Sequence, residues 1–556
     1  MTPQPTERPY DLIVGGGIND TGIARDAAPR GLRTLLLEQD DPSAATSTWN
    51  SRMIQGGMKC LEHGEIGLVH ELLREREWLL RAAPHLVKPL LFMMPFLRRN
   101  RRGSLILRAG MLAYDVLSFD KSLPMHRILS RESALEVVPG IDRDEIRGAA
   151  LFYDAQAEFA ERLSVENALG AEQAGASVLV HTPATRLVVE AGRVTGVEYR
   201  DELTGETGLA QAPVTVNAAG PWADAVLATI GGEQRRRIGG TKGTHLVVDP
   251  FPGAPRYAMY YEAAADGRPV LVIPWRGRYV IGSTDVRAEG DPGEQRADDA
   301  EFEYILGETN RLIPSAGLTR DSVRLVYTGV RPLPYMPGVP ESKIPRSHLI
   351  VDHAPELEGL FTIVGGKLTT FRSLADQTVS KVERKLGRQA RRSATRTVPL
   401  PGGVTRSVAA EIAALAIESD LPPATAARLV GIYGSRARLV AELVAEHPEL
   451  GRPLREDVAM IGAEVVMALR HEHARTLEDV FHRRAMLAFD APIDAQLREA
   501  AARIAEAHAG WTDAWIADDL AGRHGRPSGL WRPSGARAPA AVAGAVRDDA
   551  VPAAVR

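Results

Sequence analysis

The chain opens on short apolar runs separated by glycine and polar turns, the pattern of strands that are buried on both faces. Residues 10–14 are predicted to form a strand that runs into glycines at 15–17, and residues 33–37 a second strand. The segment between them is helical, and Pro29 followed by Gly31 should end or kink this helix. Strand, tight turn, helix and strand predict the first unit of a dinucleotide-binding fold.

Two kinds of pattern follow. Apolar residues spaced among charges predict an amphipathic helix over residues 62–86 that ends at Pro84. Beyond residues 399–403, alanine-rich helical spacing continues to about residue 520 and predicts a separate helical domain, whereas the final residues lack periodic spacing and are typical of a disordered tail. Runs of β-branched residues predict strands at 177–180, 186–189, 194–199, 214–216, 242–248, 270–275, 279–285, 326–333 and 360–364.

Residues 88–117 allow two interpretations. Apolar runs flank a basic cluster at residues 98–102, and this combination can lie on an anionic membrane surface. The simpler alternative, which we prefer, is a solvated charge run between two core helices.

Composition narrows the classes of function. At 556 residues and 60.2 kDa the chain should form several domains, and its net charge of −4 gives no basic bias toward nucleic acid. The single cysteine, Cys60, excludes an internal disulfide or a cysteine-cluster metal site, and fits a reducing cytoplasm. No apolar stretch reaches the roughly 18 residues of a spanning helix, so we expect any membrane contact to be peripheral. His471-Glu472-His473 lacks zinc-motif spacing, and we expect no metal there.

The glycine turn is the first candidate for chemistry. Gly15 and Gly17 let the turn close tightly, so that backbone N–H groups at the helix N-terminus can approach a pyrophosphate. Glu38 ends the second strand, roughly 20 residues further on, where a carboxylate can bind an adenosine ribose. The alternative is a glycine-rich turn between buried elements.

One residue departs from the G-x-G-x-x-G pattern. Its third glycine should fall at position 20, where this chain has Asp20. We expect the Asp20 side chain to crowd the packing of the strand against the helix, and its charge to face the pyrophosphate. Both effects should weaken binding of a dinucleotide.

Blocks in one order along residues 10–520 resemble the FAD-dependent, quinone-linked glycerol-3-phosphate dehydrogenases. They are residues 13–19, 51–61, 72–76, 83–86, 217–222, 242–245, 273–275, 282–285, 329–333 and 365–370. The resemblance implies an α/β fold: an FAD-binding Rossmann-like domain, an inserted α+β substrate domain and an all-α C-terminal domain. The implied boundaries are 1–85, 156–240 and 341–398 for the FAD-binding domain, 86–155 and 241–340 for the substrate domain, 399–522 for the helical domain and 523–556 for the tail.

The family's reaction oxidises sn-glycerol 3-phosphate to dihydroxyacetone phosphate, and its FAD passes electrons to a membrane quinone. The resemblance therefore implies a cytoplasmic protein held peripherally on the inner face of the cell membrane, with a homodimer as a possible assembly. His245 is the expected base, because an imidazole titrates near neutrality. Lys367 should place a cation near the flavin, and Arg331 serves catalysis and phosphate binding.

Further contacts are carried over from the family's motifs. Arg346 should bind phosphate with Arg331, and Lys59 and Thr370 should also contact substrate. Without the resemblance, these arginines read as surface residues and His245 as a core histidine. The expected FAD contacts are Gly15, Gly16, Gly17, Ile18, Asn19, Glu38, Gln39, Thr46, Ser47, Ser51, Gln55, Gly56, Gly57, Ala219, Gly220, Gly366, Lys367, Leu368 and Thr369.

The chain departs from its relatives beside the flavin. Where they commonly carry His-Gly-Gly-Leu-(Arg or Lys)-Tyr, this sequence has Gln55, which cannot take up a proton, and Cys60, which lacks a phenol. Lys59 keeps the charge but not a guanidinium fork. Two alternatives stay open beside the dehydrogenase: an oxidase that reduces oxygen, and a catalytically weakened paralogue that binds flavin or substrate.

Overall fold

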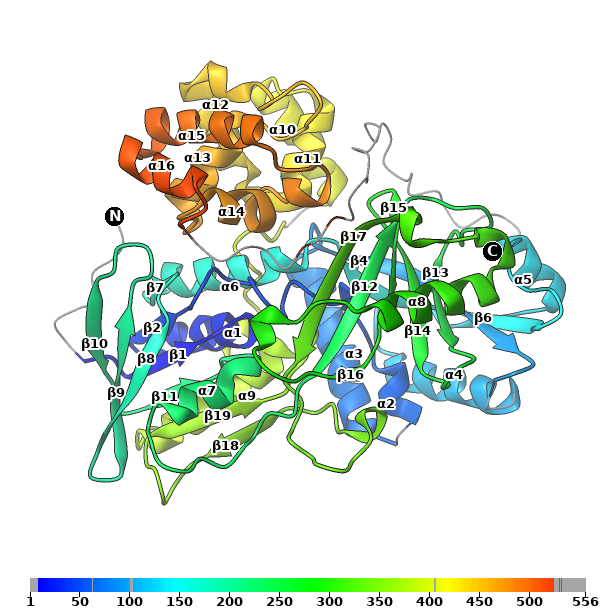
Figure 1. Ribbon diagram of the computed structural model, residues 1–556, viewed down its shortest axis with the longest axis horizontal. Helices are drawn as coiled ribbons and strands as arrows, with labels where there is room; N and C mark the ends of the chain where they lie inside the picture. Colours follow the sequence, from blue (N-terminus) through cyan, green and yellow to red (C-terminus); the bar gives the residue numbers. More distant parts are fainter. Residues whose placement is uncertain are drawn as a thin grey trace.

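The computed structural model describes residues 9–62, 64–100, 104–404, 407–524, 530 and 532. Two sheet regions lie side by side and a group of helices sits above them (Figure 1). The first region holds a six-stranded sheet in the order β18-β19-β11-β1-β2-β7. Its strands are β1 (Leu12–Gly15), β2 (Thr34–Leu37), β7 (Ser177–Leu179), β11 (Thr215–Asn217), β18 (Leu349–Asp352) and β19 (Leu360–Val364).

Both faces of this sheet are covered. Five strands run parallel, and β18 pairs antiparallel with β19. Helices α1 (Ile18–Ala27), α6 (Ala160–Gln173) and α9 (Phe371–Lys385) bury Val14 and Leu36 on one face. Leu35 and Leu37 point to the other face, where they pack against β8 (Ala184–Glu190), β9 (Arg193–Arg200), β10 (Thr207–Gln211) and α7 (Ala223–Ala228). This double cover explains the unbroken apolar runs.

The first helix ends where its sequence predicts. After Ala27 the chain makes one 3₁₀ turn, Ala28–Arg30, and Gly31 then adopts a positive φ of 77°. The expectation that Pro29 and Gly31 stop the helix is confirmed.

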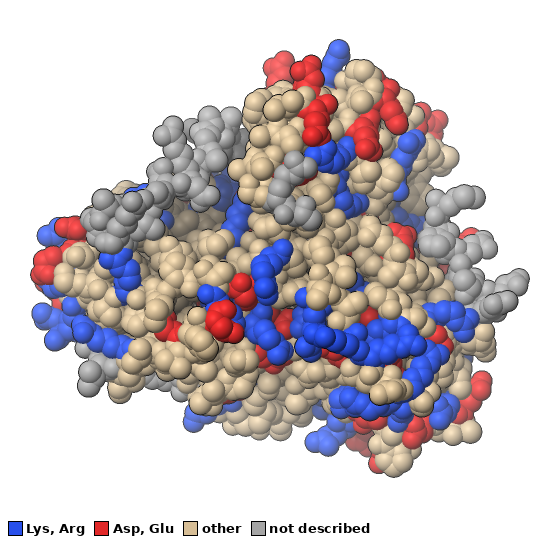
Figure 2. Space-filling model, turned by 180° about the vertical axis from the view of Figure 1, so that it is seen from behind, with Lys and Arg blue, Asp and Glu red and all other residues tan. Residues whose placement is uncertain are grey.

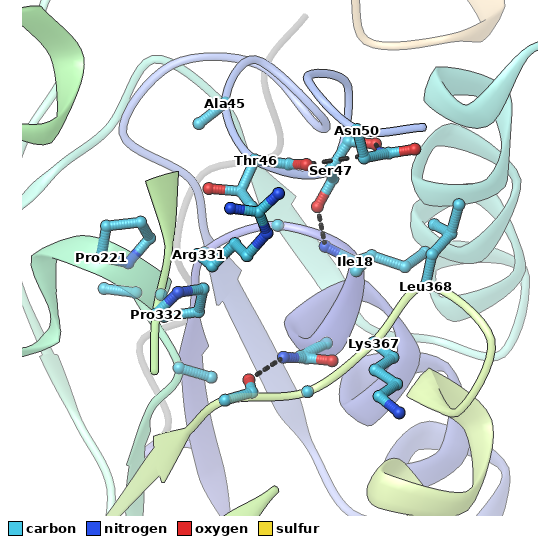
Figure 3. A pocket seen from close by; sticks show the side chains of 18 of the residues that line it. Ile18, Ala45, Thr46, Ser47, Asn50, Pro221, Arg331, Pro332, Lys367 and Leu368 are labelled. Atoms are coloured by element: carbon cyan, nitrogen blue, oxygen red, sulfur yellow. Dashed lines mark hydrogen bonds between the residues drawn. The ribbon is translucent and has the colours of Figure 1, made fainter. Parts of the chain in front are cut away.

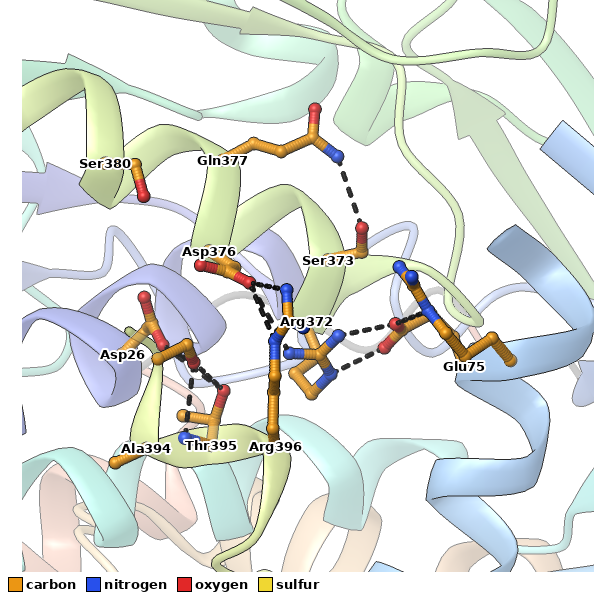
Figure 4. A network of polar contacts seen from close by, with 12 residues as sticks. Asp26, Glu75, Arg372, Ser373, Asp376, Gln377, Ser380, Ala394, Thr395 and Arg396 are labelled. Atoms are coloured by element: carbon orange, nitrogen blue, oxygen red, sulfur yellow. Dashed lines mark hydrogen bonds and ion pairs between the residues drawn. The ribbon is translucent and has the colours of Figure 1, made fainter. Parts of the chain in front are cut away.

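A buried polar network holds the helices of this layer together (Figure 4). Arg372 on α9 donates to both carboxylate oxygens of Glu75 on α3 (Ile66–Ala82), at 2.6 and 2.5 Å. Asp376, one turn further along α9, accepts from Arg396 at 2.8 Å and from Arg30 at 2.9 Å. These pairs fix α9, and therefore the loop that precedes it, against α1 and α3.

The second region is a ten-stranded sheet in the order β16-β12-β15-β14-β13-β4-β6-β3, with β17 on β12 and β5 on β6. Helices α5 (Arg131–Val137) and α8 (Asp299–Leu312) contribute to its core. Its strands are β3 (Met53–Ile54), β4 (Val87–Leu97), β5 (Arg127–Leu129), β6 (Ile146–Ala157), β12 (Thr241–Val248), β13 (Ala258–Glu262), β14 (Pro269–Trp275), β15 (Arg278–Gly282), β16 (Val286–Arg287) and β17 (Val323–Arg331).

Two expectations from periodicity need correction. The preferred interpretation of residues 88–117, two core helices, is wrong in its first half, because β4 pairs with β6 along its whole length. A short apolar run does not reveal by its spacing whether it is strand or helix. The helix expected over 62–86 is α3, which begins four residues late, at Ile66, after the separate α2 (Met58–Glu62), and ends at Ala82, before Pro84 as expected. Part of the basic cluster, residues 101–102, lies outside the described residues.

The C-terminal helices dock on the first region through buried ion pairs. Asp41 accepts from Arg484 at 2.6 and 2.7 Å and from Arg483 at 2.6 Å, and Arg162 on α6 donates to Glu472 at 2.6 Å. The helices are α10 (Val408–Ser419), α11 (Pro423–Tyr433), α12 (Ala437–Glu446), α13 (Gly462–His471), α14 (Leu477–Asp479), α15 (Ala495–Ala509) and α16 (Asp513–Leu520). The predicted fold class is confirmed. Most of the expected tail lies outside the described residues.

The described surface carries mixed charge. On the face opposite to that of Figure 1, Lys and Arg side chains gather in patches with acidic side chains beside them (Figure 2). No described helix combines the length and the apolar character that crossing a membrane requires.

Candidate functional site

A cavity of about 470 Å³ opens between the two sheets. The carboxyl ends of β1, β2, β11 and β19 form one wall, which is where open parallel sheets bind ligands. Tyr260, Ser283 and Arg331 from the second sheet line the opposite side. The residues that line the cavity come from segments spread between residue 13 and residue 369.

The glycine turn closes one part of the cavity. Gly16 has a φ of 129°, and a Cβ there would lie 2.6 Å from the carbonyl oxygen of Ala218, so only glycine fits. At the start of α1, Ser47 Oγ accepts a hydrogen bond from the backbone N–H of Ile18 at 3.0 Å (Figure 3). Asn19 Nδ2 donates to the carbonyl oxygen of Gly365 at 3.3 Å and thereby joins this turn to the loop after β19.

Glu38 lies at the end of β2, as predicted, and lines the cavity. Its side chain is buried, and Oε1 accepts from the backbone N–H of Asp40 at 3.1 Å. Burial, assisted by the negative charge of Asp40, raises the pKa of Glu38 to about 8. Hydroxyl donors of a ribose would stabilise the ionised carboxylate here.

Asp20 lines the same cavity and is fully buried. Neither carboxylate oxygen has a hydrogen-bond partner among the described residues. Burial, followed by the charge of Glu38, raises the pKa of Asp20 well above its usual range, which favours the neutral acid. The Asp20 side chain thus faces the cavity next to Gly16. Because its raised pKa favours the protonated acid, it places less negative charge near the expected pyrophosphate than an ionised aspartate would.

Two arginines converge at another part of the cavity. Arg331 Nη1 lies 3.1 Å from one oxygen of Asp285, and Arg346 Nη2 lies 2.7 Å from the other. Arg331 also donates to Ser283 Oγ at 2.7 Å and to the carbonyl oxygen of Thr284 at 3.1 Å. Although burial opposes them, the two guanidinium groups lower the pKa of Asp285 to about 2. The arginines are thus held side by side in a place that an anion can reach.

His245 lies behind the cavity wall rather than in it. It belongs to β12 and is 3% exposed, and its Nε2 is 2.9 Å from the Oγ of Ser51, which does line the cavity. Burial, with the positive charges of Arg331 and Arg52, lowers the pKa of His245 to about 3. The imidazole is therefore neutral over the physiological range.

The loop after β19 also enters the cavity. Gly366 has a φ of 106°, and Lys367, Leu368 and Thr369 line the wall (Figure 3). Lys367 Nζ lies 3.1 Å from Cys60 Sγ.

The remaining expected contacts divide by position. Thr370 is buried at the start of α9 and does not line the cavity. Gly56 is also absent from the lining, because Tyr114 and Leu73 pack against it. The side chain of Lys59 lies outside the described residues. Every other predicted cofactor contact lines the cavity: Gly15, Gly16, Gly17, Ile18, Asn19, Glu38, Gln39, Thr46, Ser47, Ser51, Gln55, Gly57, Ala219, Gly220, Gly366, Lys367, Leu368 and Thr369.

Among the polar lining residues that sequence reasoning missed are Ser283, Asp285 and Arg268. Ser283 and Asp285 belong to a segment that was interpreted as strand, and Arg268 directly precedes β14. A carboxylate directly after a buried strand was the available signal. Arg268 Nη1 donates to the carbonyl oxygen of Asp285 at 2.8 Å. It therefore supports the turn that presents the Asp285 carboxylate to Arg331 and Arg346.

The residues present fit FAD. A glycine turn without room for a Cβ, a helix N-terminus behind it and a ribose-binding acid at the next strand are the parts a dinucleotide requires. The backbone of residues 365–369 and the hydroxyls of Thr46, Ser47 and Ser51 would surround the remainder.

The comparisons with known proteins agree with this geometry. The family described as FAD dependent oxidoreductase matches residues 12–372, and the C-terminal domain of alpha-glycerophosphate oxidase matches residues 393–515. A glycerol-3-phosphate dehydrogenase of Synechocystis sp. is 44% identical over 499 residues, 87% of this chain and 90% of that protein. A D-erythritol 1-phosphate dehydrogenase of Brucella abortus is 34% identical over 487 residues, 85% of this chain and 93% of that protein.

A solved structure extends the likeness to three dimensions. The glycerol-3-phosphate dehydrogenase from Bacillus halodurans, complexed with FAD, matches with a TM-score of 0.75 at 27% identity, over 94% of this chain and 95% of that one. Sequence and structure agree over both the sheet regions and the C-terminal helices. The chain therefore belongs to the family of FAD-dependent glycerol-3-phosphate dehydrogenases.

Proposed function

We propose that the protein oxidises sn-glycerol 3-phosphate to dihydroxyacetone phosphate. The observation that carries this is the pair Arg331 and Arg346, held side by side on Asp285 at the cavity. A phosphate dianion can accept some of the hydrogen bonds that the two arginines now donate to Asp285. Its oxygens match the forked geometry of a guanidinium group. FAD, when bound, would supply the oxidant for the two electrons and the hydrogen that leave C2.

The test is anaerobic titration of the purified protein with glycerol 3-phosphate while the flavin absorbance is followed. Replacing Arg331 with Ala removes a charge-assisted contact of roughly 1.5–3 kcal/mol, so half-bleaching should need about tenfold more substrate or beyond. Arg331→Lys is the matched control, because it keeps the charge without the fork and should give an intermediate value. An unchanged dependence on substrate in the Ala variant would remove Arg331 from the phosphate site.

A second polyol phosphate is a defined competitor. The relative from Brucella abortus is named for D-erythritol 1-phosphate, whose phosphate would suit the same arginines. Comparing flavin reduction by the two compounds decides between them. Protein that neither holds nor takes up FAD would instead support the weakened paralogue, for which Gln55 and Cys60 are the motive.

For the electron acceptor we propose a membrane quinone, reached from the inner face of the cell membrane. What supports contact with the bilayer is helix α4 (Ser104–Ser118), whose described residues are apolar on both sides. Leu107, Met111 and Tyr114 are buried against the core, whereas Ile106, Leu112 and Val116 are 61%, 58% and 62% exposed on the opposite side. A helix that turns one apolar face to the core and a second apolar face outward suits a lipid boundary.

Cosedimentation with anionic vesicles tests this acceptor route. Leu112→Glu together with Val116→Glu should lower the bound fraction about tenfold or more, because each lost apolar burial is worth roughly 1.5–3 kcal/mol. The matched control makes the same change in net charge at exposed polar positions outside this helix, Gln234→Glu together with Gln389→Glu, and leaves the apolar face intact. Reduction of a soluble dye should be unaffected in all variants, and hydrogen peroxide released in step with substrate would favour the oxidase.

A further inference from the structure

The imidazole of His245 lies directly behind the cavity wall, and Ser51 stands between this imidazole and the cavity. No histidine is found among the described residues that line the cavity. His245 reaches it only through its hydrogen bond with Ser51, whose Oγ lies 2.9 Å from Nε2. Ser51 is half-buried and lines the cavity.

The imidazole is held in place on both sides. Its ring stacks on that of Tyr327, with centroids 5.0 Å apart and an angle of 20° between the planes. From the neighbouring strand, a Cβ on Gly282 would lie 3.0 Å from the His245 ring, so glycine there just provides room for it. Held in this position, His245 meets the cavity through the hydroxyl of Ser51.

We propose that Ser51 and His245 act as one proton-accepting unit in the oxidation, with Ser51 as the group that contacts the substrate hydroxyl. Ser51 Oγ takes the proton of the C2 hydroxyl while its own proton passes to Nε2 of His245. The C2 hydrogen leaves with two electrons to the bound flavin, and the C2–O bond becomes double. Substrate, flavin and the imidazole account for every atom, and this inference rests on the proposed function.

The electrostatics of the unit fit a base that is strengthened by substrate. Burial, together with the charges of Arg331 and Arg52, lowers the pKa of His245, so its imidazole is neutral and has a free site for a proton. A phosphate dianion bound at Arg331 would offset one of these charges and stabilise the imidazolium that forms. Gln55 lines the cavity where relatives commonly have a histidine, and an amide cannot take this part.

The first experiment measures the rate of anaerobic flavin reduction at saturating substrate. Ser51→Ala should lower this rate by about 10²-fold or more, and Ser51→Thr, which restores a hydroxyl, should recover most of it. Because the two residues act in one path, Ser51→Ala combined with His245→Ala should be no slower than His245→Ala alone, within about threefold. Losses that multiply in the double variant, or a Ser51→Ala rate near that of the parent, would overturn the proposal.

The second experiment needs no turnover. In protein labelled with ¹⁵N-histidine, the Nε2 signal of His245 is identified by its loss in His245→Ala, and it should shift in Ser51→Ala and stay near its parent position in Ser51→Thr. An Nε2 chemical shift that is the same in the parent, Ser51→Ala and Ser51→Thr would contradict the hydrogen bond between Ser51 and His245. If parent protein is not reduced by either polyol phosphate, the proposed function fails, while this signal still decides whether the unit exists.

Discussion

Asp20 makes a sharp prediction about FAD affinity, because its carboxyl is buried in the cavity without a hydrogen-bond partner among the described residues. Its pKa is already raised in the free protein. A pyrophosphate close by would raise that pKa further, so the complex should retain the proton to a higher pH than the free protein does. FAD affinity should therefore fall as pH rises between the two pKa values.

The magnitude follows from linkage. One pKa unit corresponds to about 1.4 kcal/mol, so each pH unit between the pKa values of the free and bound forms should cost about tenfold in affinity. Asp20→Asn keeps the bulk and has no proton to lose. Below the interval between the two pKa values, its affinity for FAD should match that of the parent within about twofold. Across that interval, the ratio of its affinity to the parent's should rise by up to about tenfold per pH unit.

The assay is fluorescence titration of apo-protein with FAD at several pH values, in the parent, Asp20→Asn and Asp20→Gly. Glu38 titrates in all three proteins, but its charge raises the pKa of Asp20 only in the parent, so the ratio of variant to parent reports the coupled pair of carboxyls. Asp20→Gly removes the side chain as well as the charge, so tighter binding than in Asp20→Asn would measure crowding by the side chain, and equal binding would assign the whole effect to charge. A ratio of Asn variant to parent that stays flat over the whole pH range in which the protein is folded would refute the electrostatic reasoning.

Two further predictions concern the docking of the C-terminal helices. Asp41→Asn should lower the free energy of unfolding by about 3–5 kcal/mol, because it leaves Arg484 buried without a carboxylate partner and leaves Arg483 with Asp479 alone. Thermal unfolding measures this, and a loss below about 1 kcal/mol would contradict the role of these ion pairs in docking. His181 lies 2.9 Å from Asp479, and this ion pair raises the pKa of His181 even though burial acts to lower it, so its stabilisation is complete below the unfolded value of about 6.5 and is lost as pH rises through the folded value. Melting temperatures between pH 6 and pH 9 should consequently decline more steeply in the parent than in His181→Asn, and equal slopes would show that His181 does not titrate with unfolding.

Local signals were enough to predict the nucleotide half of the site. The glycine turn and Glu38 are close in sequence and belong to one strand, helix and strand unit, so their spacing fixes their geometry. The end of the first helix at Gly31 is likewise set by a local property, the ease with which glycine adopts a positive φ. These features need no knowledge of the rest of the chain.

Contacts between distant segments were not accessible in the same way. Ser51 and His245 are 194 residues apart, and β17 joins their segments: it pairs with β12 at His245, and the hydroxyl of its Tyr327 donates to the carbonyl oxygen of Asn50 at 3.1 Å. The role of Asp285 depends on Arg346, which is 61 residues further along. β4 was misjudged because its partner β6 begins about fifty residues later, and pairing of that range leaves no mark on local periodicity.

The order of strands in the six-stranded sheet has a consequence for biosynthesis. β1 lies between β2 and β11, and β11 in turn pairs with β19, which ends at residue 364. A nascent chain therefore carries an open sheet edge and an unfinished nucleotide site until about two thirds of the protein has left the ribosome. FAD cannot act as an early folding template for such a chain, and chaperones that shield strand edges should influence the yield of holoprotein more than the supply of flavin does.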